Sequence, residues 1–472
     1  MSPLDVLRDV YGHANFRTSQ SQVIDHVMSG HHAMVVMPTG MGKSLCYQIP
    51  GILLRRDPAD LTLVLSPLIA LMQDQVDSLC HKGVDATFIN SSLDANVRNQ
   101  RYREVAEGRY ALLYVTPERF RKPEFREALA KRKVQLFVVD EAHCVSQWGH
   151  DFRPDYSRMA EIRSVVGDPV TIAVTATATA ECRDDIYRQL GIDAADVGLF
   201  HEGIDRPNLQ LDVQHVYDEA EKLEHLHDLL HSAMAKTGST ILYFSLIKTL
   251  QRFSDQLLSR GVDHVCYHGD LPRQARRRIQ DEFMSGHADL VLATPAFGMG
   301  IDKSDIRMVI HAETPGSIES YYQEIGRAGR DGKPSRCVWL YDQADLMTQM
   351  QFIEWSNPDA AFYGRLFDAL QSKREQCLAY GLQWLSDQLQ RISRHDHRLD
   401  TAMAMLERAG VLAGPRPPEC FDLTTDHLPA PFDDDAALGQ KKTRDQQRLY
   451  ELVKFAATDP SDRQRYLYEY FC

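Results

Sequence analysis

The sequence has few cysteines, and they lie far apart. Nine cysteines are scattered over 472 residues, and the two closest, Cys46 and Cys80, are separated by 34 positions. No C-x-x-C pair occurs. This spacing supports neither a disulfide framework nor a zinc ribbon. Free thiols in a reducing cytoplasm fit the pattern better.

Long apolar runs and an excess of positive charge are missing as well. No run approaches the roughly 18 apolar residues of a membrane span, and the N-terminus lacks the basic-then-apolar pattern of a signal peptide. We therefore expect a cytoplasmic protein without a membrane partner, associated with the nucleoid if it is bacterial. Acidic residues (66) outnumber basic ones (53), so the net charge is −13. Any nucleic acid would have to bind a local basic track, because the bulk charge repels it.

What is present is the composition of an ordinary globular protein and a regular alternation of apolar runs with helix-like stretches. Apolar residues make up 43% and charged residues 25% of the chain, which is ordinary for a globular domain. A length of 472 residues allows about three domains of roughly 150 residues. Short apolar runs alternate with helix-like stretches, which predicts a doubly wound parallel sheet buried on both faces. In the first half these runs are AMVVM (33–37), LTLVLS (61–66), TFIN (87–90), ALLYV (111–115), LFVVD (136–140) and TIAVT (171–175).

The pattern restarts after HEGIDRPNLQ (201–210), which Gly, Asp and Pro mark as a linker. We expect two tandem parallel-sheet lobes, residues 1–205 and 206–345, and a mostly helical C-terminal region, residues 346–472. Three helices followed by a short strand pair within that region would suit a winged-helix module. The runs that predict the second sheet are ILYF (241–244), HVCYH (264–268), LVLAT (290–294), RMVIH (307–311) and CVWLY (337–341), and the later helical segments are 358–370, 371–393, 398–410 and 440–472.

A phosphate-binding loop follows the first predicted strand. The segment MPTGMGKS (37–44) keeps the T-G-x-G-K-S core of a P-loop, with Thr39 and Met41 beside its glycines, although position 37 is Met. Gly40 and Gly42 let successive backbone N–H groups face phosphate oxygens. A helix starting at about Lys43 would add its positive N-terminal end. Lys43 would neutralise β- and γ-phosphates, and the Ser44 hydroxyl would hold Mg²⁺.

Two acidic residues end another predicted strand, LFVVDEAH (136–143). The carboxyl end of a strand in such a sheet is where ligands bind. Asp140 would bind the Mg²⁺ through water, and Glu141 would orient and deprotonate the attacking water. His143 would report the state of the phosphate to a second binding site.

The segment SYYQEIGRAGRDG (320–332) in the second lobe carries a third signal. Spacings of four and three place Gln323, Arg327 and Arg330 on one face of a turn or short helix. An arginine that reaches the γ-phosphate from another lobe would stabilise transition-state charge and make hydrolysis depend on lobe closure. The sequence does not decide which of Arg327 and Arg330 is this arginine finger.

These motifs, in this order, resemble those of the RecQ family of superfamily 2 helicases, over about residues 5–345. The most specific stretch is DEAHCVSQWGHDFRPDY (140–156), which joins the acidic motif to an aromatic-rich loop. The resemblance implies two RecA-like lobes and an ATP-dependent DNA helicase that moves 3′→5′ on single-stranded DNA and unwinds partly duplex DNA in recombination or repair. FRTSQ (16–20), AVTATAT (173–179) and ATPAFGMGIDK (293–303) agree with further family motifs.

The resemblance also assigns roles to residues. Gln20 would read the adenine by a bidentate amide contact, with Arg17 near it and His13 where the family often stacks an aromatic ring on the base. Trp148 and Phe152 would stack on DNA bases, and Arg153 would contact the backbone or sense the nucleotide. The residues implied to couple the two sites are His143, Thr175, Thr177, Gly300 and Asp302. The basic run RQARRR (273–278) would track phosphates or form an exposed helix face.

The chain also departs from the family pattern. Typical members carry a zinc module with four cysteines after the second lobe, whereas Cys377 and Cys420 here have no partner at ligand spacing. His395, His397 and His427 complete no recognisable ligand set, so we predict ATP and Mg²⁺ as cofactors and no zinc. The missing module keeps a second hypothesis open, a DNA-binding scaffold that binds ATP without unwinding. An RNA-directed helicase is a third, and no protein partner can be named.

Overall fold

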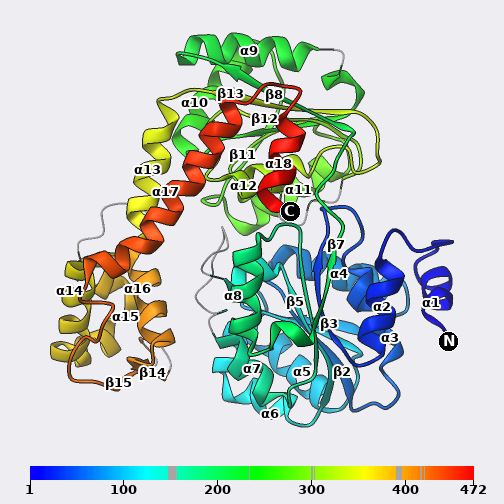
Figure 1. Cartoon of the computed structure of the whole chain (residues 1–472), viewed down its shortest axis with the longest axis vertical. Helices are drawn as coiled ribbons and strands as arrows, with labels where there is room; N and C mark the ends of the chain where they lie inside the picture. Colours follow the sequence, from blue (N-terminus) through cyan, green and yellow to red (C-terminus); the bar gives the residue numbers. More distant parts are fainter. Residues whose placement is uncertain are drawn as a thin grey trace.

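The computed structural model describes residues 1–67, 69–146, 156, 158–232, 234–298, 301, 303–389, 396–414, 417–418 and 420–472. Two parallel sheets, each flanked by helices, lie one above the other, and a group of helices stands beside the lower one (Figure 1). The predicted fold class, two tandem α/β lobes and a helical C-terminal region, is confirmed. We call them the first lobe, the second lobe and the C-terminal region.

The first lobe is built around the strands that the apolar runs predict. They lie in the order β3-β4-β2-β5-β6-β1-β7, and each neighbouring pair is parallel. Met34 and Val36 of β1 enter one hydrophobic cluster, and Ala33 and Val35 enter another on the opposite face. Both faces are covered, which explains the continuous apolar runs. The strands are β1 (His32–Val36), β2 (Asp60–Leu65), β3 (Ala86–Ile89), β4 (Leu112–Val115), β5 (Lys133–Asp140), β6 (Val170–Thr175) and β7 (Val197–His201).

The helices of the first lobe alternate with these strands. Their described bounds are α1 (Pro3–Asp9), α2 (Gln20–Met28), α3 (Leu45–Leu53), α4 (Ile69–His81), α5 (Ala95–Ala106), α6 (Pro123–Leu129), α7 (Met159–Val165) and α8 (Ala180–Leu190). Short 3-10 helices η1 (Pro117–Arg121) and η2 (Ala142–Val145) follow β4 and β5.

The second lobe repeats this construction, with strands in the order β10-β11-β9-β12-β13-β8 and parallel pairing throughout. Its strands are β8 (Leu209–His215), β9 (Ser239–Tyr243), β10 (Val265–Tyr267), β11 (Leu290–Ala293), β12 (Ile306–His311) and β13 (Ser335–Tyr341). Its helices are α9 (Glu219–His231), α10 (Ile247–Ser259), α11 (Arg273–Met284) and α12 (Ile318–Ile325).

The prediction of a linker over 201–210 is wrong at both ends. Strand β7 runs to His201 and β8 begins at Leu209, so 202–208 joins the lobes. Both strands lie at sheet edges, and β7 has only half-buried or exposed side chains. An edge strand of this kind lacks the continuous apolar run of a buried parallel strand, so neither was recognised from the sequence.

The C-terminal region begins with α13 (Asp345–Ser356) and then forms a small core of its own. Helices α14 (Ala360–Ser372), α15 (Arg374–Gln388) and α16 (Arg398–Arg408) precede the antiparallel pair β14 (Leu412–Ala413) and β15 (Asp422–Leu423). We call residues 360–432 the small unit. Its three helices and strand pair follow the order expected from the sequence, and Gly381 interrupts α15 with a φ of +73°.

The last two helices return to the second lobe. Helix α17 (Asp435–Ala457) runs from the small unit up to the second sheet, and α18 (Arg463–Phe471) ends between the lobes (Figure 1). Leu452, Phe455 and Phe471 belong to the same hydrophobic cluster as Tyr243 of β9 and Trp339 of β13. The region 346–472 therefore contributes to two separate cores.

The small unit also contacts the first lobe. The carboxylate of Glu407 on α16 lies 2.7 Å from Nη1 of Arg121 and 3.5 Å from Nη1 of Arg158. The Glu407 side chain is only 6% exposed.

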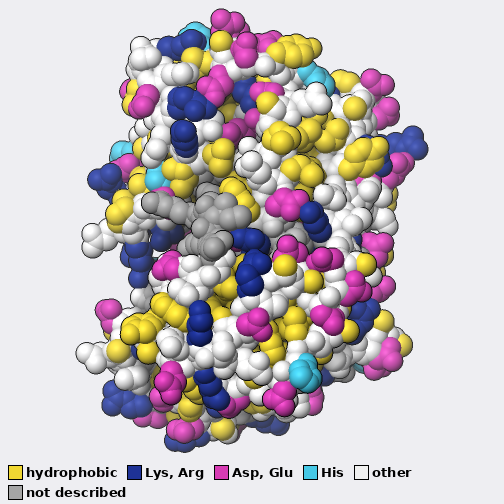
Figure 2. Space-filling model, turned by 90° about the vertical axis from the view of Figure 1, so that its left-hand side faces the viewer, with side chains coloured by type: hydrophobic (Ala, Val, Ile, Leu, Met, Phe, Trp, Pro, Cys, Tyr) yellow, Lys and Arg dark blue, Asp and Glu magenta, His cyan; other side chains and the backbone are white. Residues whose placement is uncertain are grey.

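On the face that Figure 2 shows, acidic and basic side chains are interspersed. Among the described helices, none has the length and hydropathy needed to cross a membrane.

Candidate active site

The phosphate loop lies at the carboxyl end of β1. Gly40 and Gly42 have φ angles of +87° and +82°, in the left-handed region that favours glycine. Helix α3 begins at Leu45, two residues later than predicted. The Lys43 ammonium donates to the Met37 carbonyl at 2.9 Å. Burial lowers the pKa of Lys43, and the charges of Glu141 and Asp140 oppose this shift.

The two acidic residues lie close to this lysine. Asp140 ends β5, is 7% exposed, and accepts a 3.0 Å hydrogen bond from the Glu141 N–H through Oδ1. Burial raises the pKa of Asp140; the Glu141 charge raises it further and Lys43 lowers it. Glu141 has a φ of +49°, an uncommon conformation for a residue other than glycine. Such backbone strain is concentrated at functional sites.

A chain of polar contacts leads away from Glu141. Its Oε2 lies 3.5 Å from Nδ1 of His143, and this nitrogen is 2.9 Å from the Thr175 hydroxyl. Thr175 donates in turn to the Thr177 carbonyl at 3.1 Å. His143, Thr175 and Thr177 are all buried. The structure thus brings together three of the five residues expected to couple two sites.

The N-terminal motif reaches the same loop from α2. The Gln20 amide donates to the carbonyls of Met41 at 3.0 Å and Gly42 at 3.2 Å, and its oxygen accepts from the Arg17 N–H. Arg17 itself donates to the Gly40 carbonyl at 3.4 Å. Gln20 is 1% exposed, and in this structure its amide nitrogen is bonded to the phosphate loop. His13 is exposed, and contacts of His13 and Gln20 with a base stay predictions.

The second lobe places its arginines beside this loop. Gln323 lies in α12, whereas Arg327 and Arg330 lie in the turn that follows Ile325, so one helical face does not carry all three. A β-carbon added at Gly40 would come within 3.3 Å of Cγ of Arg330. Burial and the positive charge of Arg330 lower the pKa of Arg327, while Glu141 opposes the shift. Residues of both lobes therefore converge on one place.

Five of the predicted site residues lie outside the described residues. They are Trp148, Phe152 and Arg153 of the aromatic-rich segment, and Gly300 and Asp302 of the second lobe.

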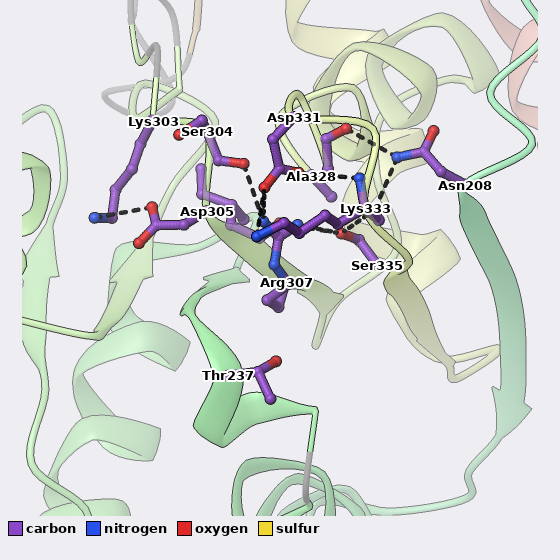
Figure 3. A network of polar contacts seen from close by, with 12 residues as sticks. Asn208, Thr237, Lys303, Ser304, Asp305, Arg307, Ala328, Asp331, Lys333 and Ser335 are labelled. Atoms are coloured by element: carbon purple, nitrogen blue, oxygen red, sulfur yellow. Dashed lines mark hydrogen bonds and ion pairs between the residues drawn. The ribbon is translucent and has the colours of Figure 1, made fainter.

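Two further residues of this site were missed in the sequence. Arg206 and Asn208, in the segment between the lobes, bond to the turn that carries Arg327 and Arg330. Figure 3 shows the polar network behind that turn, which includes Asn208, Arg307, Asp331 and Ser335. The sequence indicates only a linker at the R-P-N triplet (206–208), because the contacts of these residues depend on the packing of the two lobes.

The residues around the loop fit a magnesium ion bound with a nucleotide. The Ser44 hydroxyl makes no capping hydrogen bond at the start of α3, and Asp140 is a buried carboxylate close to Lys43. A hydroxyl and a carboxylate are the hard oxygen ligands that Mg²⁺ prefers. Over the described ranges, no group of three or more His, Cys, Asp or Glu side chains is arranged to hold a metal ion by itself.

A phosphate loop and acidic pair in one parallel-sheet lobe, faced by arginines of a second, define a two-lobed P-loop nucleotide-binding protein. The chain matches the family model for the DEAD/DEAH box helicase over residues 17–185. It matches the model for the helicase conserved C-terminal domain over residues 221–332.

Similar proteins show to which helicase family the chain belongs. The chain is 41% identical over 343 residues to the ATP-dependent DNA helicase RecQ of Haemophilus influenzae, covering 72% of this chain and 54% of that protein. It is 37% identical to the probable ATP-dependent DNA helicase RecS of Bacillus subtilis, covering 78% and 73%. The fold resembles S. cerevisiae Dbp5 bound to RNA and ADP BeF3, with a TM-score of 0.60, 18% identity, and 74% and 89% of the two chains covered. The chain belongs to the RecQ family of superfamily 2 helicases, and it spans about half the length of its RecQ relatives.

Proposed function

We propose that the protein is an ATP-dependent DNA helicase of RecQ type, which couples ATP hydrolysis to movement along single-stranded DNA. The observation that carries this proposal is the contact between Arg330 of the second lobe and Gly40 in the phosphate loop. A nucleotide in that loop would be contacted from both lobes. Relatives named as ATP-dependent DNA helicases support DNA as the substrate.

ATP would bind with its phosphates along the loop from Thr39 to Ser44, including Gly40, Met41 and Gly42. Loop N–H groups and the Lys43 ammonium would neutralise the phosphate oxygens. Ser44 and Asp140 would hold Mg²⁺, which neutralises phosphate charge when bound. At the other end of the nucleotide, His13, Arg17 and Gln20 would line the side of the base. Because Gln20 bonds to Met41 and Gly42, occupancy of the base site would be transmitted to the phosphate loop.

Hydrolysis would need groups from both lobes. Glu141 would orient the attacking water and accept its proton, since its carboxylate lies at the carboxyl end of β5 near Lys43. From the second lobe, Gln323, Arg327 and Arg330 would surround the γ-phosphate. One of the two arginines would act as the arginine finger that stabilises charge in the transition state. The reaction would therefore be fast only when the lobes are closed.

DNA would bind across the two lobes, and its binding would change the rate of ATP hydrolysis in the active site. Stacking of bases on Trp148 and Phe152, with Arg153 at the backbone, would provide grip without sequence preference. The path from Glu141 through His143 to Thr175 and Thr177 would link hydrolysis to this grip, together with Gly300 and Asp302. We propose 3′→5′ movement and unwinding of partly duplex DNA in recombination or repair.

We further propose a division into three parts, residues 1–205, 206–345 and 346–472, with α17 and α18 of the third part docked on the second. A DNA substrate would place the protein with the chromosome, which in a bacterium lies in the cytoplasm as the nucleoid.

The experiment that tests the proposal is ATP hydrolysis with and without single-stranded DNA, for the intact protein and for Lys43→Ala and Trp148→Ala. We expect many-fold stimulation by DNA, loss of hydrolysis in Lys43→Ala, and loss of the DNA response in Trp148→Ala. Lys82→Ala and Tyr217→Ala, at exposed positions, serve as matched controls. Strand displacement on a duplex with a 3′ single-stranded tail follows. Binding of DNA without hydrolysis above the Lys43→Ala background would overturn the motor and favour an ATP-binding scaffold.

A further inference from the structure

Arg206 bonds to backbone carbonyls of both lobes. It lies in the segment 202–208 that joins them and is 9% exposed. Its Nη2 donates to the Ala328 carbonyl at 2.7 Å and the Gly329 carbonyl at 3.1 Å. Its Nη1 donates to the Thr39 carbonyl at 3.4 Å. One guanidinium thus spans the phosphate loop and the turn between Arg327 and Arg330.

Asn208, two residues after Arg206, is hydrogen-bonded to the same turn. Its Nδ2 donates to the Gly329 carbonyl at 2.8 Å and the Lys333 carbonyl at 3.0 Å, and its Oδ1 accepts from Nε of Arg206 at 3.4 Å. Gly329 has a φ of +57°, and a β-carbon there would lie 2.4 Å from Nδ2 of Asn208. The turn and the joining segment are therefore fitted to each other closely.

The far side of the turn is held within the second lobe (Figure 3). Arg307 of β12 forms an ion pair with Asp331 and donates to the Ser335 hydroxyl at 3.0 Å. The Gly329 N–H donates to the Ile306 carbonyl at 2.9 Å. Because these contacts attach the turn to the second lobe, Arg206 would stay bonded to Ala328 and Gly329 when the second lobe moves. The bond to Thr39 reaches the first lobe, so it can exist only while the lobes are together.

We propose that Arg206 is a positioning residue for hydrolysis, which holds the turn 326–332 against the phosphate loop when the lobes close. The inference rests on the proposed ATPase function. Arg206 contacts carbonyl oxygens on both sides, so it acts through the placement of Arg327 and Arg330. Its bond to Thr39 makes the placement of these arginines depend on closure.

The geometry requires an arginine. Nη1, Nη2 and Nε of Arg206 each point at a different acceptor, which matches the planar fork of a guanidinium. A lysine carries one compact ammonium and cannot reach the three acceptors at once. The backbone of the joining segment is held independently, because Gln464 of α18 donates to the carbonyls of Arg206 at 3.3 Å and Leu209 at 3.0 Å. A substitution at 206 would therefore remove the fork and keep the segment in place.

The test compares Arg206→Ala and Arg206→Lys with the intact chain, in steady-state ATP hydrolysis with saturating single-stranded DNA. We expect kcat to fall about 10- to 100-fold, the range for misplaced catalytic groups. We expect KM for ATP to stay within about twofold, since the bond from Arg206 to the phosphate loop is a long one of 3.4 Å to the Thr39 carbonyl, and the side chains proposed to bind the phosphates are not replaced. Lysine should not rescue kcat. The matched control is Arg336→Ala, which removes an arginine whose Nε bonds to Asp212 on the neighbouring strand β8.

A second measurement separates positioning from general loss of structure. In Arg206→Ala with AMP-PNP and Mg²⁺ bound, amide hydrogen exchange should increase in the turn 326–332 and stay unchanged in the core strands β9 and β12. Asn208→Ala, which removes two bonds to the same turn, should give the same local increase and a smaller fall in kcat. Faster exchange over the whole second lobe in both variants would overturn the inference, because it would indicate a structural role.

The inference and the proposed function fail in different ways. If the intact protein hydrolyses ATP and Arg206→Ala does so with an unchanged kcat, the inference is overturned and the motor stands. A fall in kcat that lysine restores fully would also overturn it, because charge alone would then suffice. If the intact protein hydrolyses no ATP above the Lys43→Ala background, the proposed function fails and the inference falls with it.

Discussion

Arg330 packs directly against Gly40, so an arginine of the second lobe lies on the phosphate loop of the first. A β-carbon at residue 40 would lie 3.3 Å from Cγ of this arginine. Gly40 therefore meets two separate requirements, a left-handed backbone and room for a side chain from the other lobe. The two requirements can be separated by experiment.

We expect Gly40→Ala to lower both stability and activity. The φ of +87° strains any side chain there, which should cost about 1–2 kcal/mol, and the added methyl group would displace Arg330. Gly83→Ala is the matched control, because Gly83 has a φ of +78° and no atom within 4 Å of an added β-carbon. Both variants should lose similar unfolding free energy, and Gly40→Ala alone should lose hydrolysis, by about tenfold or more. Equal activity in the two variants would contradict the contact.

The buried carboxyl of Asp140 should make the nucleotide-free protein sensitive to pH. Burial raises the pKa of Asp140 to about 7, so the folded state holds a proton that the unfolded state releases near pH 4. This contribution to stability is complete below about pH 4 and is lost as the pH rises through about 7. The unfolding free energy of the intact protein should therefore fall relative to that of Asp140→Asn between pH 5 and 8.

Binding of Mg²⁺ should respond to the same group with the opposite sign. A protonated carboxyl is a poor ligand, so affinity for Mg²⁺ with AMP-PNP should rise as the pH increases through about 7. Calorimetric titrations at several pH values, with Asp140→Asn as the control, check this. A Mg²⁺ affinity that is independent of pH would contradict the role assigned to Asp140.

The Glu407 contact should hold the small unit against the first lobe. Glu407→Gln removes the negative charge that Arg121 and Arg158 face at 2.7 Å and 3.5 Å. Breaking a buried ion pair costs on the order of 3 kcal/mol. We expect a larger radius of gyration in small-angle scattering. The matched control is Glu375→Gln, at an exposed position of α15 in the same unit. Identical scattering from both variants would show that other contacts hold the unit.

His143 should matter more for the response to DNA than for hydrolysis itself. His143→Ala removes the ring that joins Glu141 to Thr175. We expect the ratio of DNA-stimulated to unstimulated ATPase rates to fall several-fold, because the polar path is interrupted. His225→Ala, at a partly exposed position on α9, provides the comparison. If both variants keep the wild-type ratio, the path does not carry the signal.

The fold could be predicted from the sequence wherever strands are buried on both faces. Runs such as LFVVD fill both cores of a lobe, so they are apolar at every position. The edge strands β7 and β8 do not show this pattern, because most of their side chains are half-buried or exposed. The docking of α18 also escaped it, because Leu467 and Phe471 on a polar helix do not indicate which lobe they pack against.

For the site, local motifs could be predicted and their mutual placement could not. The loop at Gly40 and the acids at Asp140 follow strands that a parallel sheet brings to one edge. Arg206 carries no such signal, since an arginine in a Gly- and Pro-containing segment is normally solvated. Its role depends on three carbonyls from two lobes, and the sequence does not encode their positions locally.

Helix α17 has 23 residues and is therefore about 35 Å long. One end is attached to the small unit and the other to the second lobe, while Glu407 attaches the small unit to the first lobe. The first lobe, the second lobe and the small unit are thus connected in a closed ring. If two of them move relative to each other, at least one further connection in the ring must change. Moving the second lobe away from the phosphate loop would therefore bend α17, rotate it, or break the ion pairs of Glu407, which couples the small unit to any separation of the two lobes.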